Sequence, residues 1–175
     1  MTIYALSSGP GISGVAIIRI SGSDASKAIT LLTRKPLPSP RIASLRKINN
    51  VNTSELIDEG IIIWFPGPES YTGEDMVEVH VHGGKAIVLA IQNELSKVEN
   101  FRLAEPGEFT KRAFLNGKLD LLQAESIASI IKSKSDINLK NQQKILSGQL
   151  SNKLLTIKQK LLDVLSHFEH HLDID

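Results

Sequence analysis

The chain has 175 residues, of which 41% are hydrophobic and 22% charged, so it is long and apolar enough to bury one core. Its formal net charge of +1 gives no broad field for attracting nucleic acid or an anionic membrane. It contains no cysteine, which excludes disulfides and zinc–thiolate sites, and no apolar run of membrane-spanning length. The first residues lack the basic and apolar regions of a signal peptide, so we expect a soluble, cytoplasmic protein that does not enter a membrane.

Residues up to about 118 hold eleven of the twelve glycines and all seven prolines, and short apolar runs alternate there with turns. The runs predict strands at 3–6, 15–20, 60–65, 75–82 and 101–104. Helices are predicted at 23–32 with Ser23 as N-cap, at 85–98 and at 106–115. This pattern predicts an α+β fold, a mixed sheet with packed helices.

Beyond Leu119 there is no proline and one glycine, which predicts an all-α segment. A first helix is expected at 119–133 and a single long one at 136–172. Apolar residues of the long helix recur in steps of four and three, which is typical of a helix in a bundle: Leu150, Leu154, Ile157, Leu161, Val164 and Phe168. Because the helix reaches Asp175 without a stop signal, we expect the natural protein to continue.

Arg19 lies inside the apolar run Val15–Ile20. A charge buried there without a partner would cost several kcal/mol, so the guanidinium must reach water, a carboxylate or an anionic ligand. An edge-strand arginine that extends to solvent is the plainer alternative.

Glu78, His80 and His82 alternate along one predicted strand and therefore share a face. They could bind a metal, although a solvent-facing polar stripe is the commoner reason for such a pattern. A carboxylate at position 78 could instead accept two parallel N–H groups from an amino-pyrimidine-like ring. His167, His170 and His171, at helical spacing, favour an exposed face, and no nucleotide-binding P-loop occurs in the chain.

Three stretches resemble the tRNA-modification GTPase family MnmE, also called TrmE. They are Trp64–Asp75 continuing to Glu78 and His82–Gly84; Ala104–Leu121 followed by Gln123–Glu125; and Gly11, Gly14–Val15 and Ile18–Gly22. They stand in family order with near-family spacing, and the resemblance covers essentially the whole chain. One departure is the loop Gly9–Ile12, where the family usually has Pro-Pro-Gly and a basic residue.

The resemblance implies that residues 1–118 form a tetrahydrofolate-binding and dimerisation domain, similar to the folate-binding domains of aminomethyltransferase-type proteins. Its ligand would be 5-formyl-tetrahydrofolate, standing in for a one-carbon donor such as 5,10-methylene-tetrahydrofolate. The family's folate contacts fall on Arg19, Glu78 and Lys118, with Glu78 expected to pair with N–H groups of the pterin. Residues 119–175 would be the first helices of a helical domain into which a GTPase domain is inserted.

The family resemblance also implies partners. With a flavoprotein, MnmG or GidA, the family builds a carboxymethylaminomethyl or aminomethyl group at C5 of the wobble uridine of tRNA, and it works as a homodimer. GTP, K⁺ and Mg²⁺ would belong to the GTPase domain, which is absent from this chain, so the chain alone should not hydrolyse GTP. The alternatives are a scaffold that docks tRNA or the flavoprotein around a vestigial folate site, and a metal-dependent hydrolase built on Glu78, His80 and His82.

Overall fold

The structure, a computed structural model, describes residues 1–9 and 11–172, and for residues 170–172 the backbone alone. The chain divides into two compact units, Met1–Lys118 and Leu119–Asp175, which are described separately. The side chains of His170 and His171 lie outside the described part. Of the three histidines near the C-terminus, His167 alone has a described side chain, which is exposed.

The first unit is built on a six-stranded mixed sheet with strand order β3-β4-β5-β2-β1-β6. The strands are β1 (Thr2–Leu6), β2 (Ser13–Ser21), β3 (Ser44–Asn49), β4 (Leu56–Phe65), β5 (Met76–Gly83) and β6 (Phe101–Leu103). Neighbours pair antiparallel except β1 and β6, which run parallel. The α+β fold predicted from the sequence is therefore confirmed.

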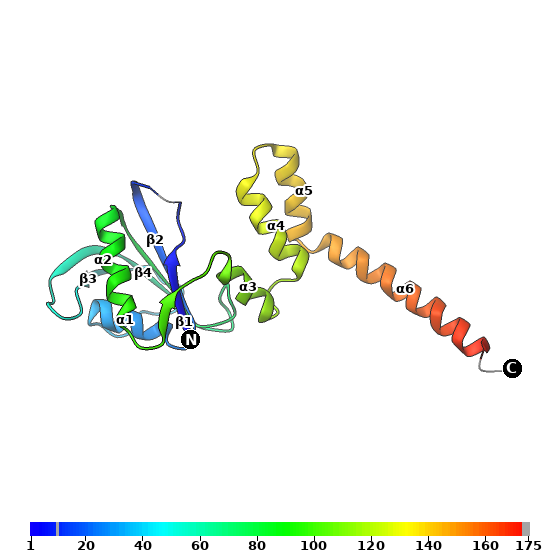
Figure 1. Ribbon diagram of the computed structural model, residues 1–175, viewed down its shortest axis with the longest axis horizontal. Helices are drawn as coiled ribbons and strands as arrows, with labels where there is room; N and C mark the ends of the chain where they lie inside the picture. Colours follow the sequence, from blue (N-terminus) through cyan, green and yellow to red (C-terminus); the bar gives the residue numbers. More distant parts are fainter. Residues whose placement is uncertain (10, 173–175) are drawn as a thin grey trace. The chain divides into compact units, whose positions relative to one another are not determined.

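One face of the sheet is covered by α1 (Ala25–Thr33) and α2 (Lys85–Ser96), and this is where the core lies (Figure 1). Side chains alternate between the two faces of a strand, so every second residue of the central strands points towards these helices. Ile18 and Ile20 of β2, Val77 and Val79 of β5, and Ile62 of β4 are at most 1% exposed. They pack with apolar residues of α1 and α2 in one cluster.

The opposite face of the sheet, which we call the site face, carries the residues between these core positions. β2 lies between β5 and β1, so Arg19 is on a central strand and the edge-strand alternative for it is wrong. A short helix, α3 (Glu108–Leu115), contributes Phe109 to this face, above Arg19. Gly107, with φ 77°, leads into α3, and a second left-handed glycine, Gly117, follows it.

Several bounds differ from the predictions by one to three residues, and three differences have a clear physical reason or consequence. β3 was not predicted, because Ser44–Asn49 follows three prolines and holds two adjacent cations that obscure its period of two. β4 begins at Leu56, four residues before the predicted strand. The N-cap of α1 is Asp24 and not Ser23, and the Asp24 backbone N–H donates to Thr2 Oγ1.

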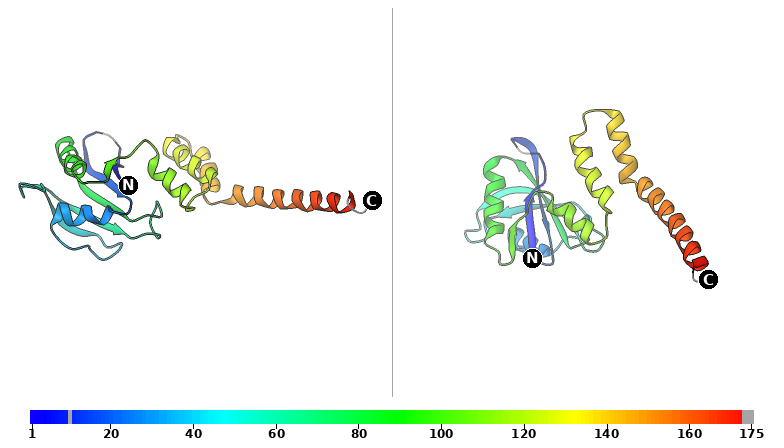
Figure 2. Two further views of the ribbon diagram at one scale, coloured as in Figure 1. Left: turned by 60° about the horizontal axis from the view of Figure 1, so that its bottom comes forward. Right: turned by 45° about the vertical axis from the view of Figure 1, so that its right-hand side comes forward.

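The second unit consists of α4 (Leu121–Lys132), α5 (Asp136–Leu146) and α6 (Gln149–Leu172). α4 and α5 run side by side, as Figure 2 shows. α4 begins with a capping box in which the Asp120 carboxylate accepts from Gln123 N and the Gln123 side chain accepts from Asp120 N. Asp120 also accepts from Ser151 Oγ at 2.6 Å, which fixes the start of α6 against the start of α4.

The single long helix predicted at 136–172 is wrong. The chain leaves the helical conformation at Ser147–Gly148, and Gly148 has φ 79°, which only glycine adopts at little cost. Gln123 Nε2 donates to Leu146 O at 2.8 Å and so satisfies a carbonyl at the end of α5. The apolar periodicity continues through the break, so it could not reveal the turn.

The predicted apolar seam of α6 is exposed within the described part of the chain. The exposed fractions of its residues run from 37% at Leu150 to 65% at Leu161. No helix among the described residues is both long and apolar enough to cross a membrane.

We predict that Gly60→Ala destabilises the first unit by about 1–3 kcal/mol. A Cβ at position 60 would lie 2.3 Å from the His80 carbonyl oxygen, so β4 and β5 would have to separate. Gly84→Ala is the matched control, because its Cβ would meet nothing closer than 3.6 Å, and it should cost less than about 1 kcal/mol. Urea unfolding followed by circular dichroism measures both, and equal stability of the two variants would contradict the close approach.

Candidate functional site

An ion pair between Arg19 and Glu78 lies at the centre of the site face. The β2–β5 register puts the two residues directly opposite each other. Arg19 donates to Glu78 Oε1 from Nε at 3.1 Å and from Nη2 at 2.8 Å. The side chains are 26% and 14% exposed, so the pair is shielded yet still accessible from solvent.

His80 holds the other oxygen of the same carboxylate, with Nε2 at 3.1 Å from Glu78 Oε2. His82 points elsewhere and pairs with Asp58, its Nδ1 lying 2.9 Å from Oδ1. Burial would raise the pKa of Asp58, but the hydrogen bonds from the backbone and ring of His82 outweigh burial and lower it. Within the described residues no three His, Asp or Glu side chains are grouped to hold a metal, so the metal-dependent alternative gains no support.

Two aromatic rings enclose the Arg19 guanidinium. Its central carbon lies 5.2 Å from the ring centre of Tyr71 and 5.6 Å from that of Phe109. Both distances are within the range of cation–π attraction, so the two rings stabilise the positively charged guanidinium in this position. The hydroxyl of Tyr71 is 2.8 Å from Thr110 Oγ1, which ties the loop at 66–75 to α3.

Lys118 lies beside the loop at 66–75 that supplies Tyr71. Its Nζ is 4.0 Å from Glu69 Oε2, and its side chain is 32% exposed. A Cβ on Gly73 would lie 3.3 Å from Lys118 Cγ, so the loop packs directly on this lysine. The structure therefore brings Arg19 and Glu78 into contact and connects Lys118 to them through the intervening loop.

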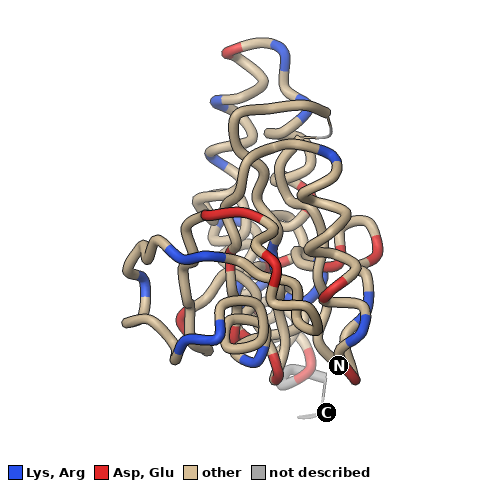
Figure 3. Tube along the Cα trace, turned by 90° about the vertical axis from the view of Figure 1, so that its left-hand side faces the viewer, with Lys and Arg blue, Asp and Glu red and all other residues tan. Residues whose placement is uncertain are grey.

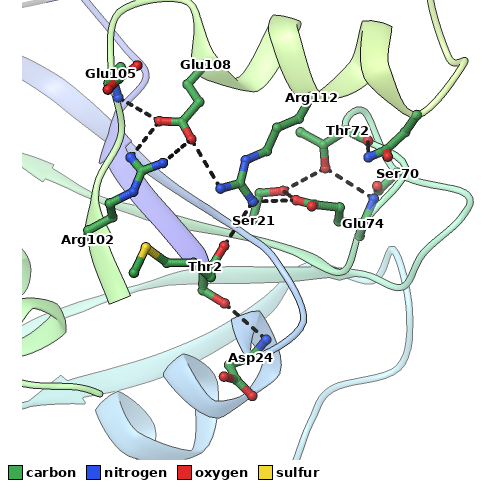
Figure 4. Close-up of polar contacts among 12 residues, drawn as sticks. Thr2, Ser21, Asp24, Ser70, Thr72, Glu74, Arg102, Glu105, Glu108 and Arg112 are labelled. Atoms are coloured by element: carbon green, nitrogen blue, oxygen red, sulfur yellow. Dashed lines mark hydrogen bonds and ion pairs between the residues drawn. The ribbon is translucent and has the colours of Figure 1, made fainter. Parts of the chain in front are cut away.

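A second set of charges fixes α3 to the sheet, as Figure 4 shows. The Glu108 carboxylate is 7% exposed and accepts from Arg102, Arg112 and the backbone of Glu105. Arg102 Nη1 donates to Oε2 at 2.8 Å, and Arg112 Nη2 donates to Oε1 at 3.2 Å. The hydrogen bond from Arg102 is the main reason that the pKa of Glu108 falls from 4.5 to about 2.

Arg112 connects this set to the loop that carries Tyr71. Its Nη1 donates to Glu74 Oε2 at 2.9 Å. Glu74 Oε2 also accepts from Ser21 Oγ at 2.9 Å, and Ser21 Oγ lies 2.7 Å from Thr72 Oγ1 (Figure 4). Since Ser21 has one hydroxyl proton, Thr72 must donate to it. The loop is thus bonded both to β2 and to α3.

A cavity of about 290 Å³ lies beside His80, lined also by His82 of β5, Gly14 and Val15, Leu45 and the stretch 59–61. Its volume is at the small end of ligand pockets. A larger cavity of about 420 Å³ is lined by Leu6, Ala16 and residues of α2, including Val88 and Leu89. That one is mostly apolar and has no carboxylate in its lining, so it lacks the acceptor needed for an amino-substituted ring.

Sequence reasoning singled out Arg19, Glu78 and Lys118 as candidates, but it did not foresee that Tyr71 and Phe109 lie over Arg19 or that His80 contacts Glu78. The two aromatics belong to motifs that carried the family resemblance, yet a single sequence contains no signal that folds both over β2. His80 was noticed only as a possible metal ligand. Its contact with Glu78 follows from the period of two along β5.

The family model described as "GTP-binding protein TrmE N-terminus" matches residues 2–118. The chain is 59% identical over 173 residues to "tRNA modification GTPase MnmE" of Pelagibacter ubique, covering 99% of this chain and 39% of that protein. A Wolbachia protein of the same name is 47% identical over 172 residues, covering 98% of this chain and 38% of the relative.

A human protein, "5-taurinomethyluridine-[tRNA] synthase subunit GTPB3, mitochondrial", is 42% identical over 173 residues, covering 98% of this chain and 35% of its own length. The chain therefore spans between about a third and two fifths of the length of these relatives.

We predict that Glu108→Gln destabilises the first unit at pH 7 but much less near pH 2. The pKa of Glu108 is depressed in the fold, so the carboxylate stabilises above pH 4.5, and this contribution is lost as the pH falls towards about 2. The full difference corresponds to about 3 kcal/mol, which screening at Arg102, 39% exposed, reduces to about 1–2 kcal/mol. Urea unfolding at several pH values tests this; a constant difference between parent and variant would contradict it.

Proposed function

Because this chain belongs to the family of the GTP-binding protein TrmE N-terminus, we propose that its first unit binds a reduced folate at Arg19, Glu78 and Lys118. The ligand would be 5-formyl-tetrahydrofolate or 5,10-methylene-tetrahydrofolate. When bound, such a folate supplies the one-carbon unit for the modification. The residues of the chain would bind and orient it.

One observation carries the proposal: two central strands carry a charged pair, Arg19 and Glu78, and two aromatic rings lie over its arginine. A sheet that needed only stability could fill positions 19 and 78 with apolar residues, since a partly buried ion pair stabilises little over a packed apolar pair. The arginine and glutamate instead form a charged group with aromatic rings over the arginine and His80 beside the glutamate. Such groups are the usual anchors of an oriented ligand.

The hydrogen-bonding groups suit a pterin. The Glu78 carboxylate can only accept hydrogen bonds, which suits the two adjacent N–H groups of an amino-pyrimidine ring. The Arg19 guanidinium can only donate them, which suits the carbonyl oxygen of the same ring. Oε1 of Glu78 already accepts two bonds from Arg19, while Oε2 accepts one from His80. We infer that Arg19 gives up one of its bonds to Glu78 and directs that donor to the ligand.

The cavity beside His80, at 290 Å³, is small for a whole folate, and Arg19, Glu78 and Lys118 are not among its lining residues, so it could hold only a part of the ligand that extends past Glu78. The benzoyl-glutamate tail of the ligand would then lie along the surface, where Lys118 could meet a carboxylate. A second copy of the chain could enclose the tail, which is the reason to propose a homodimer whose folate sites lie near the interface.

We further propose that the whole protein acts in tRNA modification in the cytoplasm. There it would work with a flavoprotein of the MnmG (GidA) type at the wobble uridine, as the resemblance implies. GTP, K⁺ and Mg²⁺ would be used by parts of the protein outside these 175 residues. Three relatives carry names that refer to tRNA, and this supports the proposal.

The scaffold alternative predicts a different result at the same residues. In a vestigial site Glu78 would no longer contact folate, so replacing it would not change how the chain interacts with folate. The contact from His80 and the aromatic enclosure of Arg19 favour the folate proposal, because a vestigial site has no need to hold both oxygens of one carboxylate.

We expect Glu78→Ala to weaken 5-formyl-tetrahydrofolate binding by about 2–4 kcal/mol, or about 30-fold to 1000-fold in Kd, because ligand N–H groups would be left unpaired. Isothermal titration calorimetry on the purified chain measures this. The control is Glu99→Gln, an exposed carboxylate in the turn before β6, which should leave Kd unchanged. Unchanged affinity in a folded Glu78→Ala chain would refute the role of Glu78.

The proposed dimer is tested separately by light scattering. The chain should have twice its monomer mass of 19.2 kDa at tens of micromolar, a concentration at which even a modest interface is occupied. A monomer under these conditions, with and without 5-formyl-tetrahydrofolate, would contradict a folate site completed by a second copy.

A further inference from the structure

The charge of the chain is unevenly distributed. Between Asp24 and Glu55 there are six Lys and Arg residues and no Asp or Glu. Since the whole chain carries +1, the remaining residues together carry −5. An almost neutral protein therefore contains a strongly basic segment, which the overall charge conceals.

Five of these cations form what we call the basic rim: Arg34, Lys35, Arg41, Arg46 and Lys47. They follow the end of α1, the proline-containing loop after it and β3, the edge strand of the sheet. In Figure 3, blue Lys and Arg positions recur along the loops at the left of the view. The sixth cation, Lys27, pairs with Asp24 and is not included.

The three rim arginines are held in place by backbone carbonyls without being neutralised. Arg34 Nη2 donates to Val51 O at 3.0 Å, and Arg46 Nη1 donates to Pro36 O at 2.6 Å. Arg41 donates to the backbone carbonyl of Glu69. Within the described part of the chain, no rim residue forms an ion pair with a carboxylate, although Glu59 stands opposite Lys47 in the strand register.

Protection of the sheet edge against pairing with another chain explains only some of the rim cations. Charged residues on an edge strand prevent pairing with another chain, and that accounts for Arg46 and Lys47. It does not account for Arg34 and Arg41, which lie outside the strand with φ of 57° and 60°. A non-glycine residue in this region costs about 1–2 kcal/mol, so arginine occupies two positions where glycine would be less strained.

We propose that the basic rim binds the phosphate backbone of RNA. Each rim arginine directs at most two of its N–H donors to the protein, so the others can meet phosphate oxygens. The exposed Leu37, Ile42 and Leu45 between the cations can contact ribose and base. The choice of RNA among polyanions rests on the proposed function in tRNA modification.

The test uses the whole chain and a fluorescein-labelled RNA hairpin, with affinity measured by anisotropy between about 50 and 200 mM salt. Lys35→Gln with Lys47→Gln changes two exposed residues whose ammonium groups are not bonded within the described part of the chain, so folding should not change. We expect weaker binding and a slope of log Kd against log salt that is smaller by about 2, one for each phosphate that the variant no longer neutralises. Lys140→Gln with Lys153→Gln removes the same charge from exposed positions of α5 and α6 and should change neither value.

Equal effects of the two double variants would overturn the proposal, because binding would then follow net charge alone. It would also be overturned if the parent bound vesicles of phosphatidylcholine and phosphatidylserine but not the hairpin. Titration of 5-formyl-tetrahydrofolate into the same variants separates the two proposals. Weakened RNA binding with intact folate binding supports both, whereas a parent that binds RNA but no folate defeats only the proposed function.

Discussion

The Glu108 carboxylate is the group on which the site face depends. Four N–H donors converge on it, two from Arg102, one from Arg112 and one from the backbone of Glu105. Arg112 then carries the connection to Glu74, and through Ser21 to β2. These bonds matter because the eight residues of α3 bury little apolar surface of their own, and few other contacts hold the helix to the sheet.

The same bonds set the position of the two rings around Arg19. Phe109 is the residue next to Glu108, and Tyr71 belongs to the loop that Glu74 and Thr72 anchor. Every buried polar side-chain atom among the described residues has a hydrogen-bond partner, so the face has one well-defined arrangement. The charges that hold the site are thus distinct from the charges proposed to bind the ligand.

The sequence was informative where a local rule decides the structure. Alternation placed Glu78 and His80 on one face, and glycine and proline marked most of the turns. It was uninformative where a contact joins residues far apart in the chain. No sequence pattern predicts that Arg112 bonds to Glu74, 38 residues earlier. The break at Gly148 was missed because one glycine within a periodic helix is often tolerated.

The most direct test of this account is calorimetric titration of 5-formyl-tetrahydrofolate into Glu108→Gln at pH 7, in a preparation shown to be folded. Glu108 makes no contact in the proposed site, so any effect must pass through α3 and the loop at 66–75. The account predicts binding weaker than in the parent by about tenfold or more, as the rings lose their fixed positions. Parent-like affinity in the folded variant would contradict the claim that this buried carboxylate organises the site.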